Sequence, residues 1–71
     1  MPKFESHEFV VTDAEIQETG NVEVFEATSI SQAVDSVVAS KSLDGYTVKI
    51  GPTGRTVNAG NYQYAIVPSK R

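Results

Sequence analysis

The side chains with the greatest capacity for acid–base chemistry are a single histidine and a group of carboxylates near the N-terminus. His7 lies between Ser6 and Glu8 and is the only histidine of the chain. General acid–base catalysis needs a titratable group held in a cleft, often beside a nucleophile. The sequence has no cysteine to act with His7, so an ordinary surface histidine on an edge strand is the favoured interpretation. We therefore predict a protein that is not an enzyme.

Metal and phosphate chemistry have little support in the residue pattern. A zinc site would need carboxylates for all ligands except His7, which is unusual, and the acidic residues lack the spacing of an EF-hand loop. The Gly51–Arg55 segment is rich in glycine, but it lacks the lysine and the following helix of a phosphate-binding loop. A plain hairpin turn is predicted there, and we expect no metal and no cofactor.

Carboxylates are concentrated in the first third of the chain and could form one negative surface. They are Glu5, Glu8, Asp13, Glu15, Glu18, Glu23 and Glu26. If the first two strands lie together at one side of a sheet, these groups would suit a basic groove on a partner and would steer association. The candidate partner-binding residues are Glu8, Asp13, Glu15, Glu18, Glu23 and Glu26. The alternative is the ordinary charge that protects an edge strand from aggregation.

Tyrosines and basic residues of the second half offer an alternative binding surface. Aromatic and basic side chains interleaved on a sheet are a common way to bind single-stranded nucleic acid. The candidates are Tyr46, Lys49, Arg55, Tyr62 and Tyr64. The net charge of −3 works against phosphate binding. In the other interpretation these tyrosines cap the core and keep their hydroxyls at its rim.

A helix over residues 30–41 is the element that the sequence predicts most securely. Ser29 and Gln32 have the spacing of a capping box. The apolar residues that follow have the spacing of a helix with one buried face, at Ile30, Ala33, Val34, Val37 and Val38. Lys41 suits the negative C-terminal end of the helix dipole. The helix should end near Gly45, which is free to take a positive φ.

Strand-like runs flank this helix on both sides. They cover His7–Thr12 and Asn21–Ala27 before it, and Tyr46–Ile50, Arg55–Ala59 and Tyr62–Val67 after it. We interpret Asp13–Gly20 as a polar connection that could contain a helical turn at Ala14–Glu18. Short turns join the last three strands, which predicts an antiparallel meander. The fold class is therefore α+β, with one amphipathic helix packed on an antiparallel sheet of four to five strands in the order ββαβββ.

A chain of 71 residues forms a single domain, with frayed ends expected near 1–5 and 69–71. The second strand could face either way, because Val22 and Val24 point to one side and Phe25 and Ala27 to the other. A bulge could resolve this conflict. The predicted core consists of Phe9, Val11, Val24, Ile30, Ala33, Val34, Val37, Val38, Val48, Val57 and Ile66.

Charge is divided unequally along the chain. Residues 1–44 carry all nine acidic residues and two lysines, a net charge of −7, whereas residues 45–71 carry four basic residues and no acid, a charge of +4. Such asymmetry can mark an interaction surface, although a fold that interleaves the halves would dilute it. The sequence contains no long apolar run and no apolar segment at its start. We expect a cytoplasmic protein without membrane insertion.

The segment Val22-Glu-Val-Phe-Glu-Ala-Thr-Ser-Ile-Ser-Gln-Ala33 resembles small phage-encoded proteins that take over the host. Over residues 22–50 the chain is similar to type I-F anti-CRISPR proteins and to the podophage inhibitor of bacterial RNA polymerase. The resemblance implies a helix-plus-sheet unit without catalysis that occupies a nucleic-acid groove on a host complex. In their charge, the acidic residues of this chain are more similar to the polymerase inhibitor than to the anti-CRISPR proteins. The resemblance transfers no binding residue by position.

Three hypotheses follow from these observations. The first is a phage-encoded protein-binding module that inhibits or modulates a host nucleic-acid-handling complex through its acidic first hairpin. The second is a structural or accessory domain that self-associates through a sheet edge, giving a homo-oligomer. The third is a single-stranded nucleic-acid binder that uses the tyrosines of the sheet. The first hypothesis, by contrast, involves a protein partner and no direct contact with nucleic acid.

Overall fold

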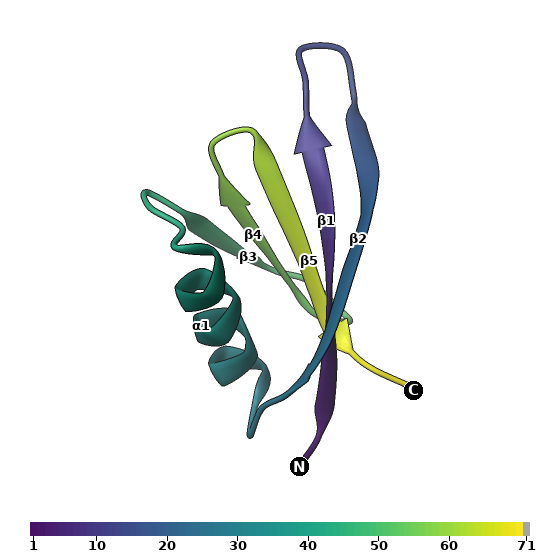
Figure 1. The fold of residues 1–71 in the computed structure, drawn as a ribbon, viewed down its shortest axis with the longest axis vertical. Coiled ribbons are helices and arrows are strands. Elements are labelled where there is room, and N and C mark those ends of the chain that lie inside the picture. The colour runs from purple at the N-terminus through teal and green to yellow at the C-terminus, as the bar shows by residue number, and fades with distance from the viewer. Residues whose placement is uncertain (71) are drawn as a thin grey trace.

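The computed structural model describes residues 1–70 and contains one helix and one sheet. The elements are β1 (Lys3–Val11), β2 (Ile16–Glu26), α1 (Ile30–Lys41), β3 (Thr47–Ile50), β4 (Arg55–Ala59) and β5 (Tyr62–Pro68). The strands form one antiparallel sheet in the spatial order β2-β1-β5-β4-β3. α1 lies on one side of this twisted sheet (Figure 1). The predicted α+β class and the order ββαβββ are confirmed.

The helix forms where the sequence predicts it, and Ser29 caps its N-terminus. The Ser29 hydroxyl accepts a hydrogen bond from the Gln32 backbone N–H at 3.2 Å. The Gln32 side chain reaches past Ser29, and its Oε1 accepts the Thr28 backbone N–H at 2.5 Å, so only half of the expected capping box forms. At the other end Ser42 takes the left-handed conformation, with φ of 53°. Gly45 also has a positive φ, of 62°, but it lies in the connection to β3.

The first hairpin is longer than the sequence predicts. β2 begins at Ile16, so most of the segment 13–20 is strand, and the helical turn expected at 14–18 is wrong. Pairing of Val11 with Ile16 leaves only a short turn, in which the Thr12 backbone N–H donates to the Glu15 carbonyl at 2.9 Å. Cross-strand hydrogen bonds along two long strands therefore outweigh the polar composition of this segment.

A bulge interrupts the hairpin before Val22, so it does not resolve the conflict along the second strand: Val22 and Val24 lie on the face away from the helix, and Phe25 and Ala27 lie on the helix side. His7 pairs with Val22 and Phe9 pairs with Glu18, so one residue of β1 faces three residues of β2. Gly20 lies in this bulge with φ of 88°, a conformation that favours glycine. Because the bulge adds residues to one strand only, it lets β2 keep its pairing with β1 on both sides of the irregularity.

Register decides which side chains face the helix. Successive residues of a strand point to opposite faces. Phe4 of β1, Phe25 of β2, Ile66 of β5 and Val57 of β4 all lie on the helix side. The buried apolar side chains are Phe4, Ala27, Ala33, Val34, Val37, Val57, Tyr64 and Ile66, and Phe25, Ile30, Val38 and Leu43 pack against them.

Four positions predicted for the core are wrong. β1 buries Phe4, and by alternation this directs Phe9 and Val11 to the face away from the helix. Val24 lies on that face too, where it is 42% exposed. Val48 faces the helix side from β3 but remains 42% exposed, because α1 packs mainly on β1, β4 and β5.

The two chain ends lie beside each other on the sheet. Lys3 to Glu5 belong to β1, and the Ser69 backbone N–H donates to the Lys3 carbonyl at 2.8 Å. The ordered sheet thus includes part of the regions where we expected frayed ends, while Arg71 lies outside the described residues. Among residues 1–70, no helix has both the length and the apolar character needed to cross a lipid bilayer.

Candidate functional site

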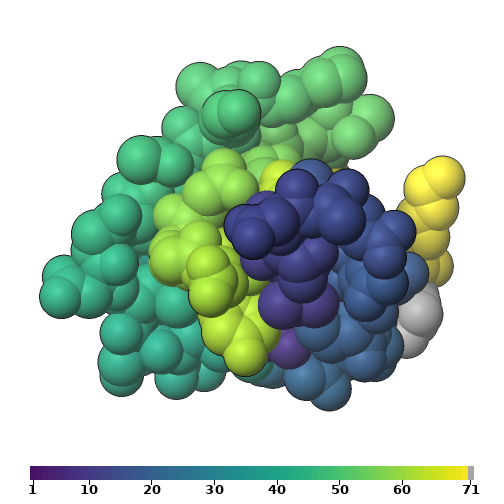
Figure 2. Space-filling view, turned by 90° about the horizontal axis from the view of Figure 1, so that it is seen from above, coloured from purple at the N-terminus to yellow at the C-terminus, as the bar shows by residue number. Residues whose placement is uncertain are grey.

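The six carboxylates proposed for partner binding do not share one surface. By register, Glu8 and Glu23 lie on the helix side of the sheet, whereas Glu18 and Glu26 lie on the opposite side. Asp13 and Glu15 lie in or next to the turn at the hairpin tip. What the residues share is the β1–β2 hairpin itself. Seen from above, this hairpin, in purple and blue, lies on the far side of the yellow-green β4–β5 hairpin from the teal helix (Figure 2).

Glu8 has an internal structural role in the bulge. Its Oε1 accepts hydrogen bonds from the Thr19 hydroxyl and the Asn21 amide, both at 2.9 Å. Its Oε2 accepts the Tyr64 hydroxyl at 3.0 Å. These donors, Asn21 first, lower the pKa of Glu8 below its usual value, against the opposing effect of burial. Glu8 therefore ties together three strands and is not available as a docking charge.

Tyr64 completes this arrangement from β5. Its side chain is only 4% exposed, and burial, followed by the hydrogen bond to Glu8, raises its pKa to about 12. The Lys41 Nζ lies 5.7 Å from the centre of its ring, within the range of a cation–π contact. Tyr64 is thus a core residue with its hydroxyl at the rim of the core. For this tyrosine, core capping describes the structure better than nucleic-acid binding does.

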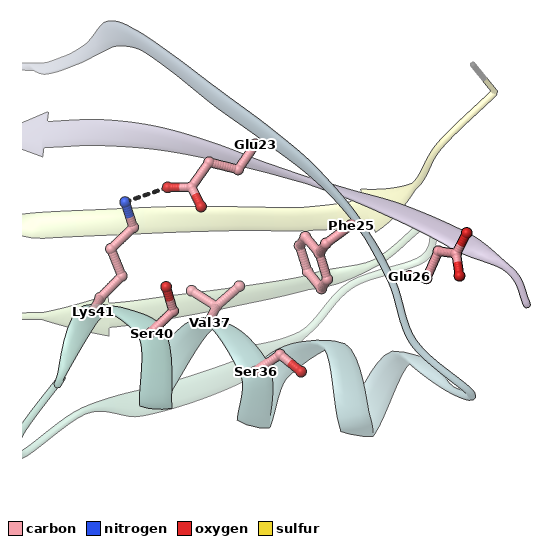
Figure 3. A pocket seen from close by; sticks show the side chains of 7 residues that line it. All are labelled: Glu23, Phe25, Glu26, Ser36, Val37, Ser40 and Lys41. Carbon is pink, nitrogen blue, oxygen red and sulfur yellow. Dashed lines mark hydrogen bonds and ion pairs between the residues drawn. The ribbon is translucent and has the colours of Figure 1, made fainter.

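A cavity of about 200 Å³ lies between β2 and α1. Phe25 and Val37 form its apolar floor, and Glu23 and Lys41 face each other at one end (Figure 3). The small Ser36 and Ser40 side chains line the helix wall, where longer residues would close the space. The remaining lining residue is Glu26, whose carboxylate points away from the helix.

The pair of Lys41 and Glu23 bridges this cavity from helix to strand. The Lys41 Nζ donates to the Glu23 carboxylate at 2.5 Å. This hydrogen bond is the main reason that the pKa of Lys41 is raised above its usual value. Both side chains are partly open to solvent, 26% for Lys41 and 52% for Glu23, and such a pair contributes less than about 1 kcal/mol to stability. It can therefore open at little cost.

The cavity runs beside a free sheet edge. β2 is the last strand on its side of the sheet. The Ala27 backbone N–H donates to the Pro2 carbonyl at 3.2 Å. Because bonded and non-bonded pairs alternate in an antiparallel ladder, Phe25 and Glu23 direct their backbone groups to β1. Val22, Val24 and Glu26 then direct theirs outward, where no strand of residues 1–70 pairs with them.

Four of the five alternative nucleic-acid residues lie on the helix side of the sheet, and only Lys49 lies on the other side. Tyr64 is buried, and Arg55 is partly buried, with its Nη1 donating to the Gly54 carbonyl at 3.0 Å. Lys49 points to the side away from the helix. Tyr46 and Tyr62 are exposed, by 40% and 46%, on the helix side. The structure brings no three of these residues together on an open face.

His7 lies between two carboxylates on the side of the sheet away from the helix. Its Nε2 is 2.9 Å from Glu5 Oε1, and its Nδ1 is 3.7 Å from Glu18. Glu5 also accepts the Ser69 hydroxyl at 2.9 Å. Within residues 1–70 no three metal-ligating side chains converge. The arrangement can hold the histidine in place, but it aligns no nucleophile with it.

Sequence reasoning missed the cavity between β2 and α1. Lys41, Ser36 and Ser40 could be assigned to a helix, but their partner strand depends on the order of strands in space. One signal was present: the serines are four residues apart and therefore occupy one face of the helix, next to the apolar stripe. A helix edge of small polar residues leaves room beside the core.

The chain matches no model of a known protein family, no curated protein and no solved structure.

Proposed function

We propose that this chain is a small, non-catalytic protein-binding module that takes an extended, basic segment of a partner as an added strand along β2. The supporting observation is the pairing of a free strand edge with an adjacent cavity. Strand addition uses main-chain hydrogen bonds for affinity and pockets for alternate side chains for specificity. The outward backbone groups of Val22, Val24 and Glu26 offer the main-chain hydrogen bonds. The space above Phe25 and Val37 offers a pocket for a side chain of the partner.

Charge supports a basic occupant. β2 carries Glu18, Glu23 and Glu26 and no basic residue. Opposite charges on neighbouring strands stabilise their pairing, and like charges destabilise it. A second copy of β2 would bring its own carboxylates against these, so self-pairing along this edge is disfavoured. An incoming strand with lysine or arginine at alternate positions would present them all on one face of the sheet, and on the helix side they would meet Glu23.

The absence of a catalytic arrangement among the described residues is consistent with a binding role. The cavity contains serines and one lysine, but Lys41 is protonated in its pair with Glu23. No histidine lines it. In this proposal the chain is a phage-encoded inhibitor that engages a basic segment of a host nucleic-acid-handling complex.

The test uses a defined probe, a capped synthetic peptide that alternates valine and lysine, titrated into the 15N-labelled protein. We expect amide shift changes at Val22, Val24 and Glu26, and an affinity that falls as salt screens the carboxylates. The same peptide with every amide N-methylated should not bind, because neither of its edges then keeps a main-chain donor.

Matched variants test the role of the strand edge. Val24→Pro removes an outward N–H while leaving the ladder to β1 intact, and it should abolish peptide binding. Val24→Thr keeps the N–H and should bind like the parent chain. Far-ultraviolet circular dichroism checks that both remain folded. Equal binding by Val24→Pro and Val24→Thr would show that β2 is not the docking strand.

A further inference from the structure

The opposite edge of the sheet has a different chemistry from β2. β3 is the last strand on that side, and Figure 1 shows it at the edge opposite to β2. Ile50 is 79% exposed, Val48 42% and the adjacent Tyr46 40%. By alternation all three face the helix side. β3 has no acidic residue, and its only charge, Lys49, points to the other side.

A second, more open cavity of about 290 Å³ lies along this edge, between α1 and β3. Val34, Val48 and Ile50 provide its apolar lining. Asp35 and Arg55 add one negative and one positive charge. The surface is thus apolar with balanced charge, which allows it to meet an identical surface without net repulsion.

The backbone along β3 is also available for pairing. The Gly51 N–H donates to the Gly54 carbonyl at 3.0 Å, which makes the neighbouring pair of Ile50 and Arg55 a non-bonded one in the ladder. By the same alternation Val48 directs its N–H and C=O outward. No strand of residues 1–70 covers them. An exposed apolar strand edge is a ready template for another strand.

We infer that two copies of this chain associate antiparallel through β3, with Val48 opposite Val48 of the second copy at a two-fold axis. This register places Tyr46 opposite Ile50 of the second copy and Lys49 opposite Thr47. Each opposed Val48 donates its N–H to the other and accepts in return, as bonded antiparallel pairs do. The two helices then lie on the same side, and the apolar side chains of both edges form one continuous surface.

Charge disfavours two competing arrangements. The register centred one residue further along the chain places Lys49 opposite itself, and like charges directly opposite are destabilising. Pairing through β2 would bring together strands that each carry Glu18, Glu23 and Glu26 without a base. The β3 dimer is therefore the self-complementary arrangement. It leaves both β2 edges free, so it does not depend on the binding mode proposed above.

The four-residue length of β3 sets the strength of the association. A pair of such short strands buries an interface in the weak class, less than about 1,200 Å² in total. The dimer should therefore form between micromolar and millimolar concentration. Sedimentation equilibrium over that range should show a reversible monomer–dimer equilibrium, with the amide signals of Val48 and Ile50 shifting as concentration rises.

Two lysine substitutions provide a matched comparison. Val48→Lys places an ammonium opposite itself at the axis and should leave a monomer at every concentration. Val24→Lys changes a valine of equal exposure, 42%, on the opposite edge strand and should dimerise like the parent chain. A parent chain that stays monomeric at millimolar concentration would overturn the inference, as would equal dimerisation of the two variants.

The register has its own test, because the chain contains no cysteine. A bonded antiparallel pair has a Cα–Cα distance of about 5.5 Å, which a disulfide can span. Val48→Cys should form a disulfide-linked dimer under mild oxidation with oxidised glutathione, whereas Lys49→Cys should remain mostly monomeric on a non-reducing gel. Faster cross-linking of Lys49→Cys than of Val48→Cys would overturn the proposed register.

Discussion

The Tyr64 hydroxyl on β5 donates a hydrogen bond to Glu8 on β1 at 3.0 Å, at the position where β2 bulges. The same carboxylate accepts from Thr19 and Asn21 on β2. Three strands thus meet at one side chain. This contact holds the long acidic hairpin against the rest of the sheet, and it leaves Glu8 engaged within the fold.

The hydrogen bond between Tyr64 and Glu8 should appear as a coupling energy. Tyr64→Phe keeps the buried ring but removes the donor, and Glu8→Gln removes the charge. We expect a coupling of about 1 kcal/mol in a double-mutant cycle, measured by urea unfolding at neutral pH. Tyr62→Phe, which changes an exposed tyrosine of the same strand, should not couple to Glu8→Gln. Additive effects of Tyr64→Phe and Glu8→Gln would contradict the role assigned to the contact.

Stability should fall at alkaline pH because of Tyr64. Burial and the hydrogen bond to Glu8 raise its pKa from 10.0 to about 12, so the folded chain holds this proton more tightly than the unfolded chain does. The resulting stability is complete below pH 10.0 and is lost as pH rises toward about 12. The free energy of unfolding of Tyr64→Phe should decline less over this interval. Parallel pH profiles for the two proteins would rule out the shift.

Gly54 is needed where the β3–β4 turn approaches β5. A Cβ at this position would lie 2.2 Å from the Ile66 carbonyl oxygen, whereas a Cβ at Gly51 would have its nearest neighbour at 3.6 Å. Gly54→Ala should therefore destabilise the protein by about 2 kcal/mol through overpacking, and Gly51→Ala should change stability by less than about 0.5 kcal/mol. Thermal unfolding of both variants provides the comparison, and similar melting temperatures would contradict the close approach.

Lys41 should weaken the binding of a basic strand, because it competes for Glu23. Lys41→Met removes this competitor and leaves Glu23 free to meet a lysine of the valine–lysine peptide. We expect binding to tighten about threefold at low salt, in keeping with the small energy of exposed ion pairs. Lys49→Met makes the same charge change on β3 and should have a smaller effect in calorimetry. Unchanged affinity in Lys41→Met would place the peptide away from the cavity.

Local patterns predicted the elements that depend on neighbouring residues. The stripe from Ile30 to Val38 and the Ser29 cap located α1, because a helix satisfies its hydrogen bonds within one segment. The alternating strands and short turns after it located β3 to β5. The first hairpin was predicted less well, because Asp13 to Gly20 is polar and becomes strand only through pairing with β1.

The fold class, the helix and the meander follow from the amino-acid sequence alone, since each depends on periodicity, capping and turn chemistry within a few residues. Tertiary structure alone decided that Phe4 and not Phe9 enters the core, that Glu8 is held by Tyr64, and that Ser36 and Ser40 line a cavity beside β2. These outcomes depend on strand order and on a register in which one step turns every side chain to the other face. The two free edges likewise arise from the order β2-β1-β5-β4-β3, which places an acidic strand at one end and an apolar strand at the other.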